Sequence, residues 1–584
     1  MTRPATVARL IATYLARHGV QRIYGLCGGH VQPIWDEADR LGIRIVDVRH
    51  EAAAVYMAHA EAEVVGGLGV AMVTAGPGLT NTVTAIANAW VSRAPVLVIS
   101  GRPPRPQTGM GALQDMPQAA LVTPVCRRVE VVSERHHVLP RLDAVVEAAR
   151  GGYGPTGPAY IDFPTDLLEE PVGEADVDPG HMTAHPAYAV TPSEADLDRA
   201  CEVIRRARRL LVISGRGVGA ARESLLAFLE LSGALHLDTS ESRGAVPPGH
   251  PASVPALRSR AMREADVVVT LGRRLDFQLA YGSRAVFSPA AAFVRIGRTP
   301  DETSEGRRGD AEVRAEPGLA LASLVERAAA PAQPDHAWRE ALVADNAARL
   351  ARLASTLESQ APGADGRMHP YTLIAALNRW IDDSSVVVAD GGDILSFARV
   401  ALSAPTYLDC GAMGCLGVGV PFATAAALCL PGRRVVALIG DGSFGITGLD
   451  VNTAARHRAG AVFVVANNEA WNIERHDQLR RYDGNLVGVD LPGCRYDLVA
   501  RGLGLHAERV TEAAELDGAL SRAFEQAPAL IDVAVTRDAG SPDTASGLPS
   551  VPVWHALSTW DQAERERRAA ERPWEVGGGT EGMR

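Results

Sequence analysis

A glycine-rich turn with one carboxylate, Gly440-Asp441-Gly442-Ser443, separates a β-branched apolar run from a helical stretch. The next apolar run ends in Asn467-Asn468. If the two runs are neighbouring parallel strands, these polar residues share the carboxyl edge of a sheet, where open α/β sheets bind ligands. Asp441 and Asn468 offer hard oxygens, and Gly442 lets backbone N–H groups approach phosphate oxygens. The pattern predicts a Mg²⁺–phosphate site, against the alternative of an ordinary Gly-Asp turn.

Glu51 is a second carboxylate at the end of a strand-like run. It follows Arg49 and His50 after residues 43–48 and opens an alanine-rich helical stretch. A carboxylate in the first turn of a helix stabilises the helix by about 0.3–1 kcal/mol through the helix dipole. The position alone therefore does not distinguish a helix-stabilising charge from a catalytic one.

These residues depend on strands and helices that alternate along the chain. Short β-branched runs end in turn residues and are followed by helical stretches, which is typical of doubly wound parallel sheets. We therefore predict an α/β fold. The clearest strand-like runs are residues 70–74, 95–100, 210–214, 267–271, 386–389, 435–439 and 461–466.

Two turn-rich stretches divide the 584 residues into domains. Residues 172–195 carry prolines and acidic residues without a clear period, and residues 329–368 carry prolines on both sides of a charged helix. We expect three α/β domains, at 1–175, 190–330 and 365–540, followed by a C-terminal tail at 546–584. The tail is either a solvated helix with a Glu564–Arg568 pair or a cover for the active site. Gly577 to Gly579 suggest a disordered end.

Composition excludes several functions. A formal net charge of −11 argues against nucleic acid or an anionic membrane as the partner. There is no secretory signal and no run of eighteen apolar residues, so we expect a cytoplasmic protein without a membrane span. The seven scattered cysteines are expected to be small buried apolar residues rather than ligands. The chain has no lysine, which excludes Schiff-base chemistry.

Over roughly residues 5–540 the chain resembles enzymes that depend on thiamine diphosphate. The resemblance is carried by the two motifs at 440–443 and 467–468 and by Glu51. It extends to Ala75-Gly76-Pro77-Gly78-Leu79-Thr80-Asn81, to Asn88-Ala89-Trp90, and to the loop Asp409-Cys410-Gly411-Ala412-Met413-Gly414-Cys415-Leu416-Gly417-Val418-Gly419.

The resemblance implies three doubly wound parallel-sheet domains, which would be pyrimidine-binding, central and diphosphate-binding. Glu51 would hydrogen-bond the pyrimidine ring of thiamine diphosphate and help remove the C2 proton. Leu416 would lie between the two rings of the cofactor. A homodimer or homotetramer would place the active site between subunits. The expected cofactor-binding residues are Glu51, Asn81, Gly391, Asp393, Met413, Gly414, Leu416, Gly440, Asp441, Gly442, Ser443, Asn468, Ala470 and Trp471. The expected Mg²⁺ ligands are Asp441, Asn468 and Ala470.

Three branches of the family compete: acetolactate-synthase-like carboligases, 2-oxo acid decarboxylases with benzaldehyde-lyase-like enzymes, and 2-hydroxyacyl-CoA lyases with oxalyl-CoA decarboxylases. The loop 109–118, with Gln114 as the residue that binds the substrate oxygen, is similar to the lyase branch, and so are residues 271–277. Gln114 is alternatively a plain loop amide. His30 lies where benzaldehyde lyase has a histidine, and it is either a proton shuttle or a buried structural residue.

Two further positions depart from the branches. Glu474 is either a second acid–base or part of a surface ion pair. Gly297 stands where relatives with a nucleotide in the central domain carry an acidic residue, which argues against bound ADP or FAD. We expect a carbon–carbon lyase that splits a 2-hydroxyacyl-CoA into an aldehyde or ketone and formyl-CoA, and that runs backwards as a carboligase. The alternatives are a carboligase or decarboxylase acting on free acids and a non-catalytic binding protein.

Overall fold

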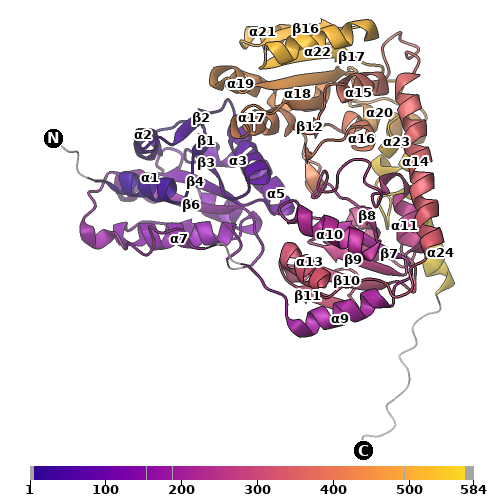
Figure 1. The fold of residues 1–584 in the computed structure, drawn as a ribbon. Helices are drawn as coiled ribbons and strands as arrows, with labels where there is room; N and C mark the ends of the chain where they lie inside the picture. Colours follow the sequence, from indigo (N-terminus) through magenta and orange to yellow (C-terminus); the bar gives the residue numbers. More distant parts are fainter. Residues whose placement is uncertain (1–4, 153, 187–188, 492, 572–584) are drawn as a thin grey trace, which may run out of the picture.

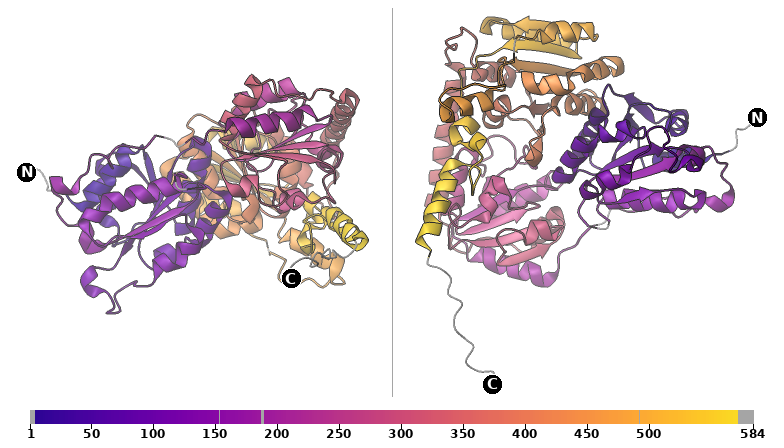
Figure 2. Two further views of the ribbon diagram at one scale, coloured as in Figure 1. Left: turned by 90° about the horizontal axis from the view of Figure 1, so that it is seen from below. Right: turned by 180° about the vertical axis from the view of Figure 1, so that it is seen from behind.

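The computed structural model of the chain describes residues 5–571 except 153, 187–188 and 492. Each of its three α/β domains contacts the other two (Figures 1 and 2). Each is built on a sheet in which every pair of neighbouring strands is parallel. The predicted class, three doubly wound parallel-sheet domains, is therefore confirmed.

The N-terminal domain has a six-stranded sheet in the order β2-β1-β3-β4-β6-β5. Alternate side chains of its central strand point to opposite faces: Leu97 and Ile99 pack against α1, α2 and α7, while Val96 and Val98 pack against α3 and α5. The strands are β1 (Arg22–Gly25), β2 (Arg44–Asp47), β3 (Gly69–Val73), β4 (Val96–Arg102), β5 (Val129–Val131) and β6 (Ala159–Pro164). The helices are α1 (Val7–Arg17), α2 (Gln32–Arg40), α3 (Glu51–Val65), α5 (Val83–Ser92) and α7 (Val138–Ala149).

The central domain has a five-stranded sheet in the order β11-β10-β9-β7-β8. Helices α9, α10 and α13 cover one face, and α11, α14 and the C-terminal helix α24 contribute to the other. The strands are β7 (Leu210–Ser214), β8 (Leu235–Leu237), β9 (Val267–Leu271), β10 (Ala292–Gly297) and β11 (Ala311–Arg314). The helices are α9 (Glu194–Arg205), α10 (Arg222–Ser232), α11 (Arg258–Glu264), α12 (Pro300–Thr303), α13 (Pro317–Glu326) and α14 (His336–Glu358).

The C-terminal domain repeats the six-stranded plan in the order β13-β12-β14-β15-β17-β16. The strands are β12 (Val386–Asp390), β13 (Thr406–Leu408), β14 (Val435–Gly440), β15 (Ala461–Asn467), β16 (His506–Val510) and β17 (Ala529–Ala534). The helices are α15 (Pro370–Asn378), α16 (Asp393–Ala401), α17 (Gly419–Cys429), α18 (Asp441–Thr447), α19 (Val451–His457), α20 (Asn472–Arg481), α21 (Tyr496–Gly502), α22 (Leu516–Glu525) and α23 (Pro542–Ser546).

Helices α3 and α17 join the two outer domains. Both are alanine-rich and buried along most of their length, and they lie in one hydrophobic core that spans both domains (Figure 1). Small side chains let the two helices approach closely, and because both helices are buried along most of their length, neither needs a continuous polar face. Because α3 begins at Glu51 and α17 follows the loop around Leu416, this core holds both candidate segments in place.

The tail is not a solvated helix. Helix α24 (Ser558–Ala570) contains the expected Glu564–Arg568 pair, at 2.8 Å, but its Trp560 is buried against the central domain. Residues 577–579 lie outside the described residues. Two cysteines, Cys27 and Cys494, are exposed, contrary to the expectation that all seven are buried. Among the described residues, no helix is both long and apolar enough to cross a lipid bilayer.

Candidate active site

The glycine-rich turn and the asparagine pair meet at one sheet edge. Strands β14 and β15 pair in parallel with Gly440 opposite Ala466. The segments that follow the two strands therefore leave the sheet side by side. A pocket of about 100 Å³ opens there. The predicted residues that line it are Gly391, Asp393, Leu416, Gly440, Asp441, Gly442, Ser443, Asn468, Ala470, Trp471 and Glu474. Of the predicted cofactor-binding residues of the C-terminal domain, Met413 and Gly414 do not line it, and Met413 is largely exposed.

Two buried carboxylates in this pocket lack a cationic partner. Asp441 is 3% exposed, and burial raises its pKa to about 7 against the opposing effect of nearby backbone N–H groups. Asp393 accepts a hydrogen bond from Asn472 Nδ2 at 2.9 Å, but its Oδ1 has no partner among the described residues. Neither carboxylate forms an ion pair within the described part of the chain. Hard carboxylate oxygens with backbone N–H groups close by fit a Mg²⁺ ion that carries a diphosphate.

Close packing explains the glycine after Asp441. A Cβ on Gly442 would lie 2.4 Å from the ring of Trp471, so any side chain would displace the indole. Asn468 is held in the same turn, because its Oδ1 accepts the backbone N–H of Ala470 at 3.1 Å. The pocket wall therefore requires a glycine at position 442 as long as Trp471 packs against it.

Asp390 positions the loop that carries Leu416. Gly391 and Asp393 line the pocket, but the neighbouring Asp390 is fully buried behind it. Its Oδ2 accepts backbone N–H groups from Gly417, at 3.0 Å, and from Gly419, at 2.8 Å. These two bonds fix the segment that directly follows Leu416 and so help to present its side chain to the pocket.

The other predicted residues lie at the carboxyl edge of the N-terminal sheet. Asn81 Nδ2 donates to Glu51 Oε2 at 2.9 Å, and Glu51 is 9% exposed. His30 Nδ1 lies 3.1 Å from Thr74 Oγ1, and burial lowers the pKa of its imidazole. Gln114 is half-buried in a left-handed conformation, with φ +64°. None of the four lines the Asp441 pocket of the same chain.

Sequence reasoning missed Gln118, which organises this edge. Its side chain is buried, and its Oε1 accepts the backbone N–H of Gly76 at 3.1 Å. Its Nε2 lies 2.8 Å from the carbonyl oxygen of Gly101 and 3.2 Å from Asp162 Oδ2. Nothing in the local sequence distinguishes it from the loop amides around it, because its partners come from three other strand ends.

The buried carboxyl group of Asp162 should make the free energy of unfolding depend on pH. Burial raises its pKa from 3.8 to about 6 in the folded chain, so between these values the folded state holds a proton that the unfolded state has lost. The free energy of unfolding should therefore fall as the pH rises from about 4 to 6, by on the order of 2–3 kcal/mol. Asp162→Asn should make this segment of the curve shallower in urea titrations of the cofactor-free protein, and Asp390, whose pKa burial also raises to about 6, should keep part of the slope. A slope identical to wild type would refute the assignment.

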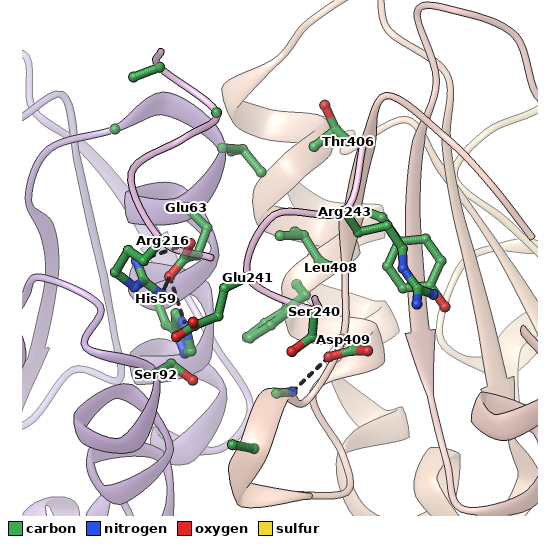
Figure 3. Close-up of a pocket in the computed structure, with 18 of the residues that line it drawn as sticks. His59, Glu63, Ser92, Arg216, Ser240, Glu241, Arg243, Thr406, Leu408 and Asp409 are labelled. Atoms are coloured by element: carbon green, nitrogen blue, oxygen red, sulfur yellow. Dashed lines mark hydrogen bonds and ion pairs between the residues drawn. The ribbon is translucent and has the colours of Figure 1, made fainter. Parts of the chain in front are cut away.

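A larger pocket, of about 460 Å³, lies where the three domains meet (Figure 3). His59 and Glu63 reach it from α3, and Leu408 and Asp409 reach it from the C-terminal domain. Between them lie charged side chains of the central domain, among them Arg216 and Glu241. Arg216 Nη2 pairs with Glu63 at 2.8 Å.

The residues beside this pocket do not fit a nucleotide. A Cβ on Gly297 would lie 2.5 Å from Glu302 Cβ, so the Glu302 side chain fills the space next to that strand end. Glu302 pairs with Arg93 and also accepts the backbone N–H of Arg298 at 2.7 Å. Glu241 pairs with Arg93 at 2.8 Å and with Arg273 at 2.9 Å. The buried guanidinium groups that could bind phosphates are thus already neutralised by carboxylates of the chain itself.

Removing Arg93 should destabilise the protein. The guanidinium is 2% exposed and joins the N-terminal domain to two carboxylates of the central domain, so Arg93→Ala leaves two buried charges partly unpaired. The expected cost is about 3 kcal/mol or more, seen as a fall in Tm on the order of 5–10 °C in a thermal melt. Arg40→Ala, which removes an exposed pair with Asp36, is the control and should leave Tm nearly unchanged. Equal melting of the two variants would contradict the prediction.

Comparison with known families accords with this architecture. The thiamine pyrophosphate enzyme models match as an N-terminal TPP binding domain over residues 5–121, a central domain over 197–324 and a C-terminal TPP binding domain over 390–533. A probable acetolactate synthase of Mycobacterium bovis is 34% identical, over 90% of this chain and 95% of its own.

Proteins named 2-hydroxyacyl-CoA lyase 2 are also similar to this chain. The one from Caenorhabditis elegans is 30% identical, over 93% of this chain and 91% of its own. The one from Homo sapiens is 31% identical, over 85% and 83%. The matches to the two kinds of enzyme thus have nearly the same identity and coverage.

Proposed function

Since this chain belongs to the thiamine pyrophosphate enzyme family, we propose that it is a lyase that cleaves a 2-hydroxyacyl-CoA. The bond between the hydroxyl-bearing carbon and the thioester carbon breaks. The hydroxyl proton leaves as the aldehyde or ketone forms, and a proton added to the thioester carbon gives formyl-CoA. When bound, thiamine diphosphate (with Mg²⁺) holds the electron pair of the broken bond. The reverse steps make the enzyme a carboligase.

In this proposal, some residues of the chain hold the metal ion and others transfer protons. Asp441 and Asn468 hold the Mg²⁺, and Glu51 moves a proton at the pyrimidine ring of the cofactor. His30 lies at the same sheet edge as Glu51, and its lowered pKa leaves a neutral imidazole that can accept the substrate hydroxyl proton near pH 7. Glu474 lines the Asp441 pocket, and burial, with Asp477 nearby, raises its pKa, as a general acid requires. Glu474 forms no ion pair with any of the described residues.

The main support for an acyl-CoA substrate is the set of relatives named 2-hydroxyacyl-CoA lyase 2, which the chain matches along most of their length. Charge adds to it. Arg480 and Arg481 lie on α20, the helix that starts at the pocket, and both are partly exposed. Both guanidinium groups pair with Asp477, at 3.1 and 3.6 Å, so two positive charges share one carboxylate and the remaining positive charge suits a substrate whose far end carries phosphates.

Calorimetry with product detection tests the substrate class. CoA and a short 2-hydroxyacyl-CoA are titrated into the protein loaded with Mg²⁺ and thiamine diphosphate, and formyl-CoA release is followed on the same samples. Binding of both with release of formyl-CoA is the expected result. Without acyl-CoA binding or formyl-CoA release the proposal falls, and activity on pyruvate, benzoylformate or benzoin would favour the acetolactate-synthase-like or benzaldehyde-lyase-like alternative.

We further propose that the active site forms between two subunits of a homodimer or homotetramer. The Asp441 pocket is lined by residues 391–474 alone, and Glu51 lies at the edge of another domain. Both edges expose apolar side chains: Met110 and Leu113 beside Gln114, and Ile446 and Leu449 after Asp441. A partner subunit would cover these side chains and complete each half-site.

Mixing two inactive variants tests this arrangement. In a shared site, Glu51→Gln and Asp441→Asn chains form mixed dimers in which one site carries both changes and the other carries none. Refolding them together should therefore recover about a quarter of wild-type activity. A site within one chain would recover nothing, because every site would then carry one defect.

A further inference from the structure

A third pocket, of about 630 Å³, lies between the C-terminal segment and the central domain. One wall is the loop of residues 280–284 and the other is formed by residues 553–555 and α24. It is separate from the Asp441 pocket, with which it shares no lining residue. Its volume is that of a typical small-molecule site.

Two aromatic rings face this pocket. Tyr281 is 50% exposed, and Trp554 is 40% exposed. Tyr281 and the preceding Ala280 both have left-handed backbone angles, with φ of +54° and +47°, which non-glycine residues rarely adopt. Such strain persists only where the surrounding structure imposes it, and it is concentrated at ligand sites. The Arg568 guanidinium lies 3.7 Å from the centre of the Trp554 ring and covers one face of it, so the other face of the indole and the ring of Tyr281 offer stacking surfaces for a planar group.

The charge of the lining is strongly positive. It contains four arginines, Arg284, Arg307, Arg567 and Arg568, against one carboxylate, Glu564. That carboxylate is already saturated, because it accepts from Arg567 at 2.6 Å, from Arg568 at 2.8 Å and from Ser283. The lining therefore keeps an excess of positive charge.

Two of these arginines lack an acidic partner. Arg307 donates only to backbone carbonyl oxygens, and Arg284 is exposed and forms no ion pair or hydrogen bond within the described chain. Arg284 is close enough to lower the pKa of Arg307, after the larger effect of burial. Asp310 partly offsets this repulsion, but its Oδ2 accepts the backbone N–H of Phe293 at 2.8 Å and forms no ion pair with Arg307, so the two neighbouring guanidinium groups can still attract an anion.

A buried imidazole atom also lacks a partner in this pocket. His555 is 5% exposed, and its Nε2 lies 3.4 Å from Glu564 Oε2. Its Nδ1 is buried without a hydrogen-bond partner among the described residues. The ring of Tyr281 lies beside the imidazole, with 6.0 Å between the ring centroids. Because this atom has no solvent-exposed surface, it does not itself contact the pocket, and the imidazole contributes only to the pocket wall.

We propose that this pocket binds a phosphorylated nucleoside, with its base against Trp554 and Tyr281 and its phosphates on Arg284 and Arg307. The chemistry is shared by two sources: the nucleotide end of CoA, and a free adenine nucleotide. The site is distinct from the three-domain junction, where carboxylates occupy the arginines. The proposal does not require the lyase activity, since occupancy is measured without turnover.

Calorimetric titration of the full chain, loaded with Mg²⁺ and thiamine diphosphate, tests the pocket. CoA, ADP and inorganic phosphate are the probes. Arg284→Ala should weaken CoA and ADP about tenfold or more, because a charge-assisted contact to phosphate is lost. Arg308→Ala is the matched control, since Arg308 is an exposed arginine of the neighbouring loop that pairs with Glu312 and lies outside the pocket. It should change neither affinity by more than about twofold.

A second variant separates stacking from charge. Trp554→Ala should weaken CoA and ADP but leave inorganic phosphate unchanged, because phosphate has no ring to stack. CoA binding well above ADP would identify CoA as the occupant, and equal affinities would identify a free nucleotide. The proposal is overturned if neither binds, or if Arg284→Ala matches Arg308→Ala. A chain that binds CoA here but releases no formyl-CoA refutes the proposed lyase function and leaves this site standing.

Discussion

Replacing Glu51 by glutamine is expected to lower kcat about 10³-fold while the affinity for thiamine diphosphate changes little. The amide is nearly the same size as the carboxyl group, and its oxygen can still accept the hydrogen bond from Asn81 Nδ2. What it loses is the proton that a carboxylic acid can give and take. The variant should therefore bind the cofactor and fail to activate it.

The proton at C2 of the bound cofactor reports this step directly. Its exchange with deuterated solvent, measured by NMR after an acid quench, should slow by a factor similar to that of kcat. Glu61→Gln is the control, because Glu61 lies on the same helix and pairs with Arg22 at 3.0 Å, away from the sheet edge. Exchange at the wild-type rate in Glu51→Gln would show that another group moves the proton, and the assignment of Glu51 would be abandoned.

Replacing Asp441 by asparagine is expected to weaken Mg²⁺-dependent cofactor binding at least ~100-fold, since even groups one shell beyond a metal cost about 10–100-fold. Asp441 is the one carboxylate among the three predicted Mg²⁺ ligands. An amide oxygen keeps the shape but lacks the charge that a hard divalent cation requires. Fluorescence titration with thiamine diphosphate at several Mg²⁺ concentrations measures the loss.

The cofactor-free Asp441→Asn protein should be at least as stable as wild type. Burial raises the pKa of Asp441 to about 7, so the ionised carboxylate is unfavourable in the empty pocket and the neutral amide removes that cost. The expected signature is an unchanged or higher Tm without cofactor, together with loss of the Tm increase on adding Mg²⁺ and thiamine diphosphate. Asp490→Asn, at an exposed carboxylate, should retain that increase. A wild-type increase in Asp441→Asn would exclude it as the metal ligand.

Most of the architecture could be predicted because it rests on local patterns. The runs at 210–214 and 267–271 are strands β7 and β9 residue for residue, since a strand buried on both faces is a nearly continuous apolar run. The meeting of Asp441 with Asn468 followed from the same logic, because parallel neighbouring strands end at one edge. Gly442 could be recognised as well, although its contact with Trp471 could not.

Other features depend on contacts between distant segments, and no local pattern encodes them. Asp390 lies next to two predicted pocket residues, yet it bonds Gly417 and Gly419 instead. Glu302 fills the space beside Gly297 because Arg93, about 200 residues earlier in the chain, holds it there. The tail has the sequence of a solvated helix, but its Trp560 is buried against the central domain.

The amino-acid sequence by itself thus determined the fold class, the family and the residues at each sheet edge, because strand periodicity and short motifs are local properties of the chain. The tertiary structure decided which charges are buried, which are neutralised and which remain available. Burial and ion pairing arise only when separate domains pack together, and they determine whether an arginine or a carboxylate stabilises the fold or stays free to bind a ligand.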